Sequence, residues 1–219
     1  MKSALVLGLV SLLTVAACGS DSDSATNTDI VRTFAASAIG TVKPEGPPAE
    51  QMTRARLAEI LTPVMLVTIE KTGQEALIAE IETNGGVATW SSVDDITISL
   101  RNGVIVATRG FGADLMSAAV PNITRNSAGG SHYSRIHVLL NGEDQPVRTA
   151  FSCTLQNAGL KAVEVVQISY QVTHLVESCG ANGVTFQNDY WFSGDQNLRK
   201  SRQWISPDVG YLTIADVRR

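Results

Sequence analysis

The chain has 219 residues, of which 44% are hydrophobic and 17% are charged, and its formal net charge is −4 at pH 7. This composition is typical of a globular protein and excludes a mainly disordered chain, a collagen-like repeat and a coiled-coil rod. The slightly acidic balance gives no electrostatic reason to expect nucleic acid as a partner. The length fits one domain, which we expect over residues 29–219.

The N-terminus has the pattern of a secretory signal. Lys2 supplies a positive charge, and the stretch from Ala4 to Ala17 is uncharged and apolar or small. A bilayer span takes about 20 residues, so this stretch is too short to cross a membrane but fits a signal peptide. It ends LTVAAC, which resembles a bacterial lipobox and predicts removal of residues 1–17 and acylation of Cys18. The alternative is ordinary secretion with an incidental cysteine.

Acylation would make outer-membrane lipid a partner of the chain. Several acyl chains on Cys18 are enough for stable anchoring. Gly19 follows the cysteine, whereas Asp at that position retains enteric lipoproteins in the inner membrane. We therefore expect a lipid anchor in the outer membrane and a domain that faces the periplasm. Residues 18–28 contain the polar run SDSDSATNT and are expected to form a flexible tether.

Two cysteines remain after Cys18, namely Cys153 and Cys179. An even pair in an oxidising compartment predicts a disulfide bond between them. Two buried free thiols are the alternative.

Two short helices are predicted before the first strand. Asp29 can cap a helix over residues 30–39, and a Pro-rich connector follows over 42–50. Thr53 can cap a second helix that runs to Leu61, because apolar residues recur at helical spacing and Pro63 ends the run.

From residue 64 onward, β-branched residues alternate with polar ones between Gly-rich turns, which predicts strands. The expected strands cover residues 64–70, 76–82, 87–90, 96–101, 104–109, 135–140, 147–156, 163–178, 184–192, 198–205 and 211–217. The fold class is therefore mainly β, a single antiparallel β-sandwich or partly closed barrel of about ten strands with two short N-terminal helices.

Two local arrangements follow from this pattern. A two-residue turn at Asn102-Gly103 would pair Leu100 with Ile105 and Ile98 with Ala107. The run 163–178 is too long for one flat strand, so we expect a bend or bulge in it. Its apolar set (Val166, Ile168, Tyr170, Val172 and Val176) would face the core, which leaves Cys179 one residue out of phase.

A search for catalytic groups finds none at a recognised spacing. The histidines form no metal motif, and His174 is in phase with the apolar face of its strand, so a core histidine is the simpler interpretation. Asp94-Asp95 fits a turn better than a pair of catalytic carboxylates. Arg109 and Asp114 are expected to form a local ion pair. We expect no enzyme activity, no metal and no cofactor.

Six residues are candidates for contact with glycan or a protein partner. The basic residues are Arg199, Lys200 and Arg202, which could bind acidic polysaccharide or lipid headgroups or could simply protect an edge strand. The aromatic residues are Trp90, Trp191 and Trp204, which could stack on sugar rings or could be buried in the core.

Two motifs resemble a known family. Trp90, the segment ISLRNG at 98–103 and the segment VATRGFGADL at 106–115 are similar to the central signature of the YjbF/GfcB lipoproteins, the group 4 capsule polysaccharide lipoproteins. The segment KSRQWISP at 200–207 is similar to their closing motif. The lipobox and the helix that leads into residues 61–63 also fit.

The resemblance implies an outer-membrane lipoprotein with a β-rich fold, associated with exopolysaccharide or capsule secretion. Its implied partners are a large outer-membrane β-barrel and a periplasmic accessory protein. It carries over no catalytic residue. We therefore expect a non-enzymatic accessory factor that docks its domain to a secretion component. A glycan-binding or glycan-modifying protein and a carrier of apolar ligands are the alternatives.

Overall fold

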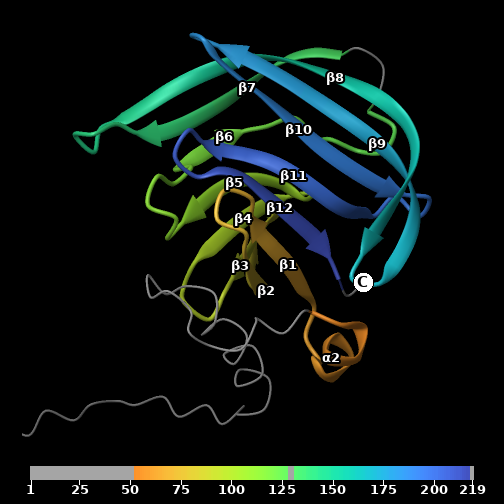
Figure 1. Ribbon diagram of the computed structural model, residues 1–219. Coiled ribbons are helices and arrows are strands. Elements are labelled where there is room, and N and C mark those ends of the chain that lie inside the picture. Colours follow the sequence, from red (N-terminus) through yellow and green to blue (C-terminus); the bar gives the residue numbers. More distant parts are fainter. Residues whose placement is uncertain (1–51, 128–130, 218–219) are drawn as a thin grey trace, which may run out of the picture.

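The computed structural model describes residues 52–127 and 131–217, which form one antiparallel sheet of twelve strands (Figure 1). The predicted helix at 30–39, the signal segment, Cys18 and the tether lie outside these residues. The strands are β1 Val64–Ile69, β2 Gln74–Asn84, β3 Val87–Ser91, β4 Thr97–Arg101, β5 Val104–Arg109, β6 Ser117–Ala119, β7 Ser131–Leu140, β8 Pro146–Val165, β9 Ile168–Ala181, β10 Val184–Ser193, β11 Leu198–Ser206 and β12 Gly210–Asp216. The predicted mainly β class is confirmed.

The sheet curls until its two edges meet. Its order is β5-β4-β3-β2-β1-β12-β11-β10-β9-β8-β7-β6, so the β1–β12 pairing joins the two ends of the described chain. The edge strands β5 and β6 approach each other, because the backbone N–H of Thr108 donates to the carbonyl of Leu115, just before β6, at 2.9 Å. Of the two predicted architectures, the nearly closed barrel is therefore correct.

The helix α2 (Arg54–Glu59) is the second of the predicted helices, and it begins at the predicted cap. Thr53 Oγ1 accepts a hydrogen bond from the N–H of Arg56 at 3.4 Å. The helix lies outside the barrel beside β1 (Figure 1). It packs onto the outer face of the sheet through an apolar cluster of Leu57, Ile60, Val64, Leu77, Val165, Ala215 and Val217.

Arg54 ties this helix to two distant parts of the chain. Its guanidinium donates to the carbonyls of Val165 and Val166 at the β8–β9 turn, and to that of Val217 after β12. The helix is thus held by hydrogen bonds as well as by apolar packing.

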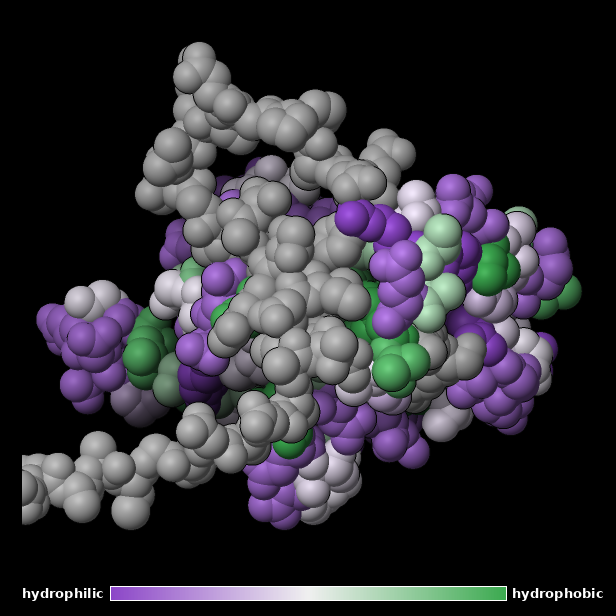
Figure 2. Space-filling model, turned by 90° about the horizontal axis from the view of Figure 1, so that it is seen from below, coloured by the Kyte–Doolittle hydropathy of each residue, from purple (hydrophilic) through white to green (hydrophobic). Residues whose placement is uncertain are grey.

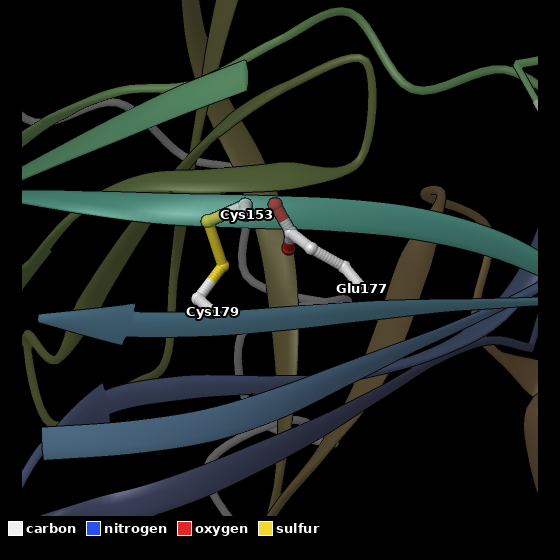
Figure 3. Close-up of side chains that lie close together, drawn as sticks. All are labelled: Cys153, Glu177 and Cys179. Atoms are coloured by element: carbon white, nitrogen blue, oxygen red, sulfur yellow. A yellow bond between two sulfur atoms is a disulfide. The ribbon is translucent and has the colours of Figure 1, made fainter. Parts of the chain in front are cut away.

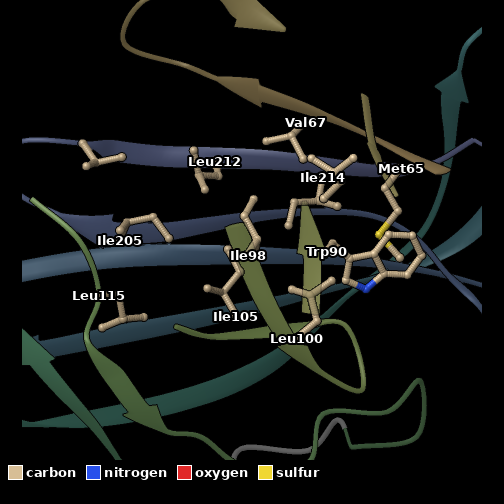
Figure 4. Close-up of a cluster of buried hydrophobic side chains, with 12 residues drawn as sticks. Met65, Val67, Trp90, Ile98, Leu100, Ile105, Leu115, Ile205, Leu212 and Ile214 are labelled. Atoms are coloured by element: carbon tan, nitrogen blue, oxygen red, sulfur yellow. The ribbon is translucent and has the colours of Figure 1, made fainter. Parts of the chain in front are cut away.

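The inward side chains of β1–β5 and β12, together with Ile205 of β11 and two loop residues, form an apolar core (Figure 4). Its buried members are Met65, Val67, Ile78, Trp90, Ile98, Leu100, Ile105, Leu115, Ile205, Val209, Leu212 and Ile214. Burial of this apolar surface is the main force that holds this part of the barrel together.

The Asn102-Gly103 hairpin forms with one difference from the predicted register. Leu100 pairs with Ile105 as expected, but Ile98 pairs with Thr108 instead of Ala107. A bulge between Ser99 and Leu100 shifts the pairing by one residue. Bulges of this kind increase the local twist, which helps the sheet to curl.

The predicted run over 163–178 is interrupted, as expected, but by a tight turn that divides it between two strands instead of by a bend or bulge within one. Val166 and Gln167 have φ values of 40° and 64° and connect β8 to β9. The residues of β9 that face the interior include Leu175, Glu177 and Cys179, so Cys179 is in phase with the inward set and needs no bulge in β9. The apolar set that the sequence placed inside faces outward, where Val166 and Tyr170 pack beside α2.

The side of the molecule seen from below is mostly hydrophilic in its described part, with small separate hydrophobic patches (Figure 2). The most exposed large hydrophobic side chains are Leu61, Ile81 and Leu160. Within residues 52–127 and 131–217, no helix is both long and apolar enough to cross a membrane.

Candidate functional site

The strands β7, β9 and β10 carry a buried charged group inside the barrel. Glu177 and Arg135 are both fully buried and pair at 2.8 Å between Oε2 and Nη1. The Glu177 carboxylate also accepts hydrogen bonds from Tyr133 Oη at 2.8 Å, Tyr190 Oη at 2.9 Å and Asn188 Nδ2 at 2.6 Å. The buried carboxylate is therefore well satisfied, as burial of a charge requires.

The pKa shifts of this network favour fixed protonation states. Burial raises the pKa of Tyr133 and of Tyr190 well above the usual value, and the negative charge of Glu177 adds to the effect. Burial lowers the pKa of Arg135, but Tyr190 and Glu177 outweigh burial and raise it overall. Both phenols remain donors and the guanidinium remains charged, so the network acts as a structural ion pair.

His137 extends the network while staying neutral. Burial, together with the positive charge of Arg135, lowers the pKa of His137 to about 3. Arg135 Nε donates to His137 Nε2 at 2.9 Å, which places the imidazole proton on Nδ1. The ring stacks on Phe186 and Trp204, with centroid distances of 5.8 and 5.7 Å.

The predicted disulfide bond joins Cys153 on β8 to Cys179 on β9 (Figure 3). The two residues are direct cross-strand neighbours, with Cα atoms 4.1 Å apart. Glu177 lies beside them. The two Sγ atoms and a carboxylate oxygen of Glu177, which are atoms of the kinds that can bind metals, all lie within 4.8 Å of one another. Because the two sulfurs are bonded to each other, they are not thiolates of the kind that ligate metals.

Charged and aromatic side chains gather on the outer face of β9–β12 and just after the end of β1, in what we call the outer strip. It consists of Glu70, His174, Asp189, Trp191, Lys200, Arg202 and Tyr211. His174 stacks on Trp191 at 4.9 Å with an interplanar angle of 8°, and Lys200 Nζ lies 5.7 Å from the same indole. His174 is buried, but on the outer face, which corrects its predicted place in the interior.

The basic side chains and His174 of the outer strip have local partners. Arg202 Nε donates to both carboxylate oxygens of Glu70, at 2.9 and 3.0 Å, and its guanidinium lies 3.4 Å from the centre of the Tyr211 ring. His174 Nε2 lies 2.8 Å from Asp189 Oδ1. The strip is therefore a mixture of both charges, not the basic patch that the sequence indicates.

The other three candidate contact residues lie elsewhere. Arg199 is buried, where its Nε donates to Ser193 Oγ at 2.8 Å and its guanidinium pairs with Asp195. Trp90 belongs to the apolar core and Trp204 to the aromatic cluster around His137. The structure thus brings Trp191, Lys200 and Arg202 together on the surface and separates them from the rest.

The idea that the basic residues protect an edge strand is wrong. The strand β11, which carries Lys200 and Arg202, lies between β10 and β12 near the middle of the sheet. Its backbone is paired on both sides.

Asp114 organises the loop that joins β5 to β6. Its carboxylate accepts hydrogen bonds from Thr108 Oγ1 at 2.8 Å and from the N–H groups of Gly110 and Phe111. Arg109 donates to the carbonyls of Thr108 and Leu115 instead of pairing with Asp114 as expected. The motif RGFGAD therefore closes the barrel, because this loop carries the chain between the two sheet edges.

Sequence reasoning missed a cavity of about 570 Å³ at the end of the barrel where β1 begins and β12 ends. Four separate segments line it, from β1–β3, the β4–β5 turn, residues 122–124 and β10–β12. The cluster of Asn residues in those turns was visible in the sequence, but each one fits ordinary turn chemistry. Their convergence depends on the closure of the barrel.

The comparisons with known proteins come from sequence and from structure. The family model "Group 4 capsule polysaccharide lipoprotein gfcB, YjbF" matches residues 31–217. The chain belongs to this family. The match covers the two motifs that pointed to the YjbF/GfcB lipoproteins in the sequence.

The solved structure of a hypothetical lipoprotein has the same fold. The crystal structure of the hypothetical lipoprotein YmcC from Escherichia coli (K12) is similar with a TM-score of 0.71 and 15% sequence identity. The similarity covers 91% of this chain and 98% of that chain. No curated protein gives a significant match.

Proposed function

We propose that this YjbF/GfcB lipoprotein is a non-enzymatic accessory factor in the production or export of an exopolysaccharide or capsule. Membership of the family over residues 31–217 carries the proposal. The chain would be anchored in the outer membrane through acylated Cys18, with its barrel in the periplasm. The lipobox and Gly19 support this location.

In this proposal the barrel docks to an outer-membrane secretion component through the outer strip. Trp191, Arg202 and Tyr211 are of the residue types that most often dominate binding energy at interfaces. The strip lies on well-paired central strands, so it is presented rigidly. Anchoring confines the domain to the membrane surface, which raises its effective concentration toward a membrane partner.

The test is complementation of a deletion strain, with surface polysaccharide as the readout. We expect wild type to restore the polysaccharide and Cys18→Ala to release the protein from the membrane fraction and lower the yield. The double variant Trp191→Ala/Lys200→Glu should remain anchored and folded but restore poorly.

A pull-down from detergent-solubilised membranes locates the interface. The outer-strip double variant should recover the secretion component at least about tenfold less well than wild type, because each interface hot spot contributes about 2 kcal/mol or more. The matched control is Arg148→Glu, which reverses an exposed charge on β8 away from the strip. Equal recovery by both variants would rule out docking through the outer strip.

A further inference from the structure

The cavity at the β1 end of the barrel has the size of a small-molecule site. Its volume of about 570 Å³ falls within the roughly 300–1,000 Å³ of typical ligand pockets. Met65, Trp90, Leu100 and Ile214 line its base and lie together at one end of the apolar core (Figure 4). These four side chains are almost fully buried, so they form a floor beneath a more polar opening.

The opening is ringed by side-chain amides from three different loops. Asn102 is in the β4–β5 turn, Asn122 precedes β7, and Asn197 is in the β10–β11 turn. Asn102 Nδ2 donates to Asn122 Oδ1 at 2.9 Å, and Asn197 Nδ2 donates to Asp195 Oδ2 at 2.8 Å. Each amide has two donor hydrogens and one acceptor oxygen, so these bonds orient the amides and leave each with further hydrogen-bonding capacity.

The opening is held rigidly across the barrel. Gln203 on β11 donates from Nε2 to the carbonyl of Gly103 at 2.8 Å and accepts from the N–H of Ile105 at 2.9 Å. Gly103 has a φ of +80°, and a Cβ there would lie 2.5 Å from Cδ2 of Leu198. The β4–β5 turn therefore sits tightly against β11, which gives the cavity a preorganised wall.

The charge of the lining separates classes of ligand. Asp216 is the charged residue among the described residues that line the cavity, and none of them is Lys, Arg or His. Cationic side chains are the usual donors to an anionic sugar or a phosphate, and this lining supplies none. The lining therefore disfavours an anionic ligand.

We infer that this cavity binds a neutral saccharide unit, an inference that rests on the proposed role in polysaccharide production. A sugar has hydroxyls that exchange hydrogen bonds with amides and an apolar ring face that suits the floor. An acyl chain fits less well, because it would cover the amide ring and leave buried polar groups without partners. The rim amides are the specificity-determining groups and the apolar floor limits the depth of entry.

The test measures binding of defined probes to the full acylated chain in vesicles of phosphatidylethanolamine and phosphatidylglycerol. Saturation-transfer NMR would compare three neutral disaccharides (lactose, maltose and diacetylchitobiose) with a glucuronate-containing disaccharide and with hexanoate. We expect transfer to at least one neutral disaccharide and much weaker transfer to the two anions. No transfer to any neutral disaccharide, or preferential binding of hexanoate, would overturn the inference.

Variants of the rim locate the site. Asn122→Ala/Asn197→Ala should weaken disaccharide binding about tenfold or more, because two hydrogen bonds to the ligand are lost. The matched control, Asn126→Ala, removes an exposed amide of the same loop that does not line the cavity, and it should bind as wild type does. Thr124→Trp should block the opening without removing a rim amide. If neither Asn122→Ala/Asn197→Ala nor Thr124→Trp weakened disaccharide binding, the saccharide would not bind in this cavity.

Complementation separates this inference from the proposed function. If the deletion strain loses its polysaccharide and wild type restores it, while no disaccharide binds, then the accessory role stands and the saccharide site fails. If disaccharides bind at the rim but deletion leaves the polysaccharide unchanged, then the binding site stands and the proposed role fails.

Discussion

The two sides of the barrel differ in what their interiors contain. On the side of β1–β5 and β12, the interior is a continuous apolar cluster that includes Ile98, Leu100 and Leu212. On the side of β7–β10, the interior also has apolar and aromatic clusters, but it contains in addition a buried ion pair between Arg135 and Glu177, surrounded by phenols and an amide. The same sheet therefore encloses an apolar core, which depends on close packing, and a second core region with buried charges, which depend on hydrogen-bond and ion-pair partners.

The difference matters because apolar contacts tolerate rearrangement and buried polar contacts do not. An apolar side chain can be replaced by another of similar volume at small cost. A buried charge that loses its partner retains its full desolvation penalty. Removing one member of the buried ion pair should therefore lower the free energy of unfolding more than a single substitution on the apolar side. Removing both members together should cost less than the sum of the two single losses.

The largest effect should come from breaking the buried ion pair. Arg135→Leu and Glu177→Leu should each lower the free energy of unfolding by about 3–5 kcal/mol, because each leaves an uncompensated charge inside the barrel. The double variant should lose much less unfolding free energy than the sum of the two single losses. Chemical denaturation of wild type, the two single variants and the double variant completes this double-mutant cycle. Additive losses would show that the pair is not coupled.

An intermediate effect should appear in the pH dependence of stability. The pKa of His137 is about 3 in the folded protein, below its unfolded value of about 6.5. As pH falls from about 6.5 toward 3, the unfolded chain takes up a proton that the folded protein does not, so stability decreases by up to about 1.4 kcal/mol per pH unit. Above about 6.5 this contribution does not change.

The variant His137→Gln isolates that contribution. Glutamine offers an oxygen acceptor for Arg135 Nε and does not titrate, so unfolding measured between about pH 5 and 7 should show a shallower slope than wild type. His132→Gln, which changes an exposed side chain, is the control. The prediction would be wrong if the His137 variant kept the wild-type slope.

The smallest effect should be a conservative change on the apolar side. Ile98→Val removes one methylene from the apolar core and should lower the free energy of unfolding by about 0.5–1.5 kcal/mol. Thermal unfolding measures the loss, and no change of its pH dependence is expected. A loss as large as that of Glu177→Leu would remove the contrast between the two sides.

The same contrast explains what could be predicted from the sequence. On the apolar side, alternation placed Ile98, Leu100 and Ile105 on one inward face, and the structure agrees. The bulge opposite Ser99 and Leu100, where β5 has one extra residue, was not predictable, because no residue type marks it. The helix cap at Thr53 was predictable because its chemistry is local.

On the polar side the same rule placed Phe151, Cys153 and Leu155 of β8 correctly inside, but it gave the wrong face for β9. The inward residues of β9 include Glu177, while the outward ones include apolar residues that α2 covers, so hydrophobic alternation pointed the wrong way. The turn at Val166-Gln167 has no Gly or Asn to mark it. The disulfide was predicted from cysteine count and compartment, whereas the amide ring of the cavity needed the closed barrel to bring its loops together.

The bonds of Arg54 have a mechanical consequence. If Cys18 holds the chain at a membrane, tension on the tether reaches the barrel at α2, and from there enters β1. Arg54 passes part of that load to the β8–β9 turn and to the end of β12, which belong to different parts of the sheet. The strand β1 is itself bonded on both sides, to β2 and β12, so a pull along it loads many hydrogen bonds in shear at once. In such a domain, tension on the N-terminal tether is resisted by many hydrogen bonds together, so β1 is not detached from the sheet one hydrogen bond at a time.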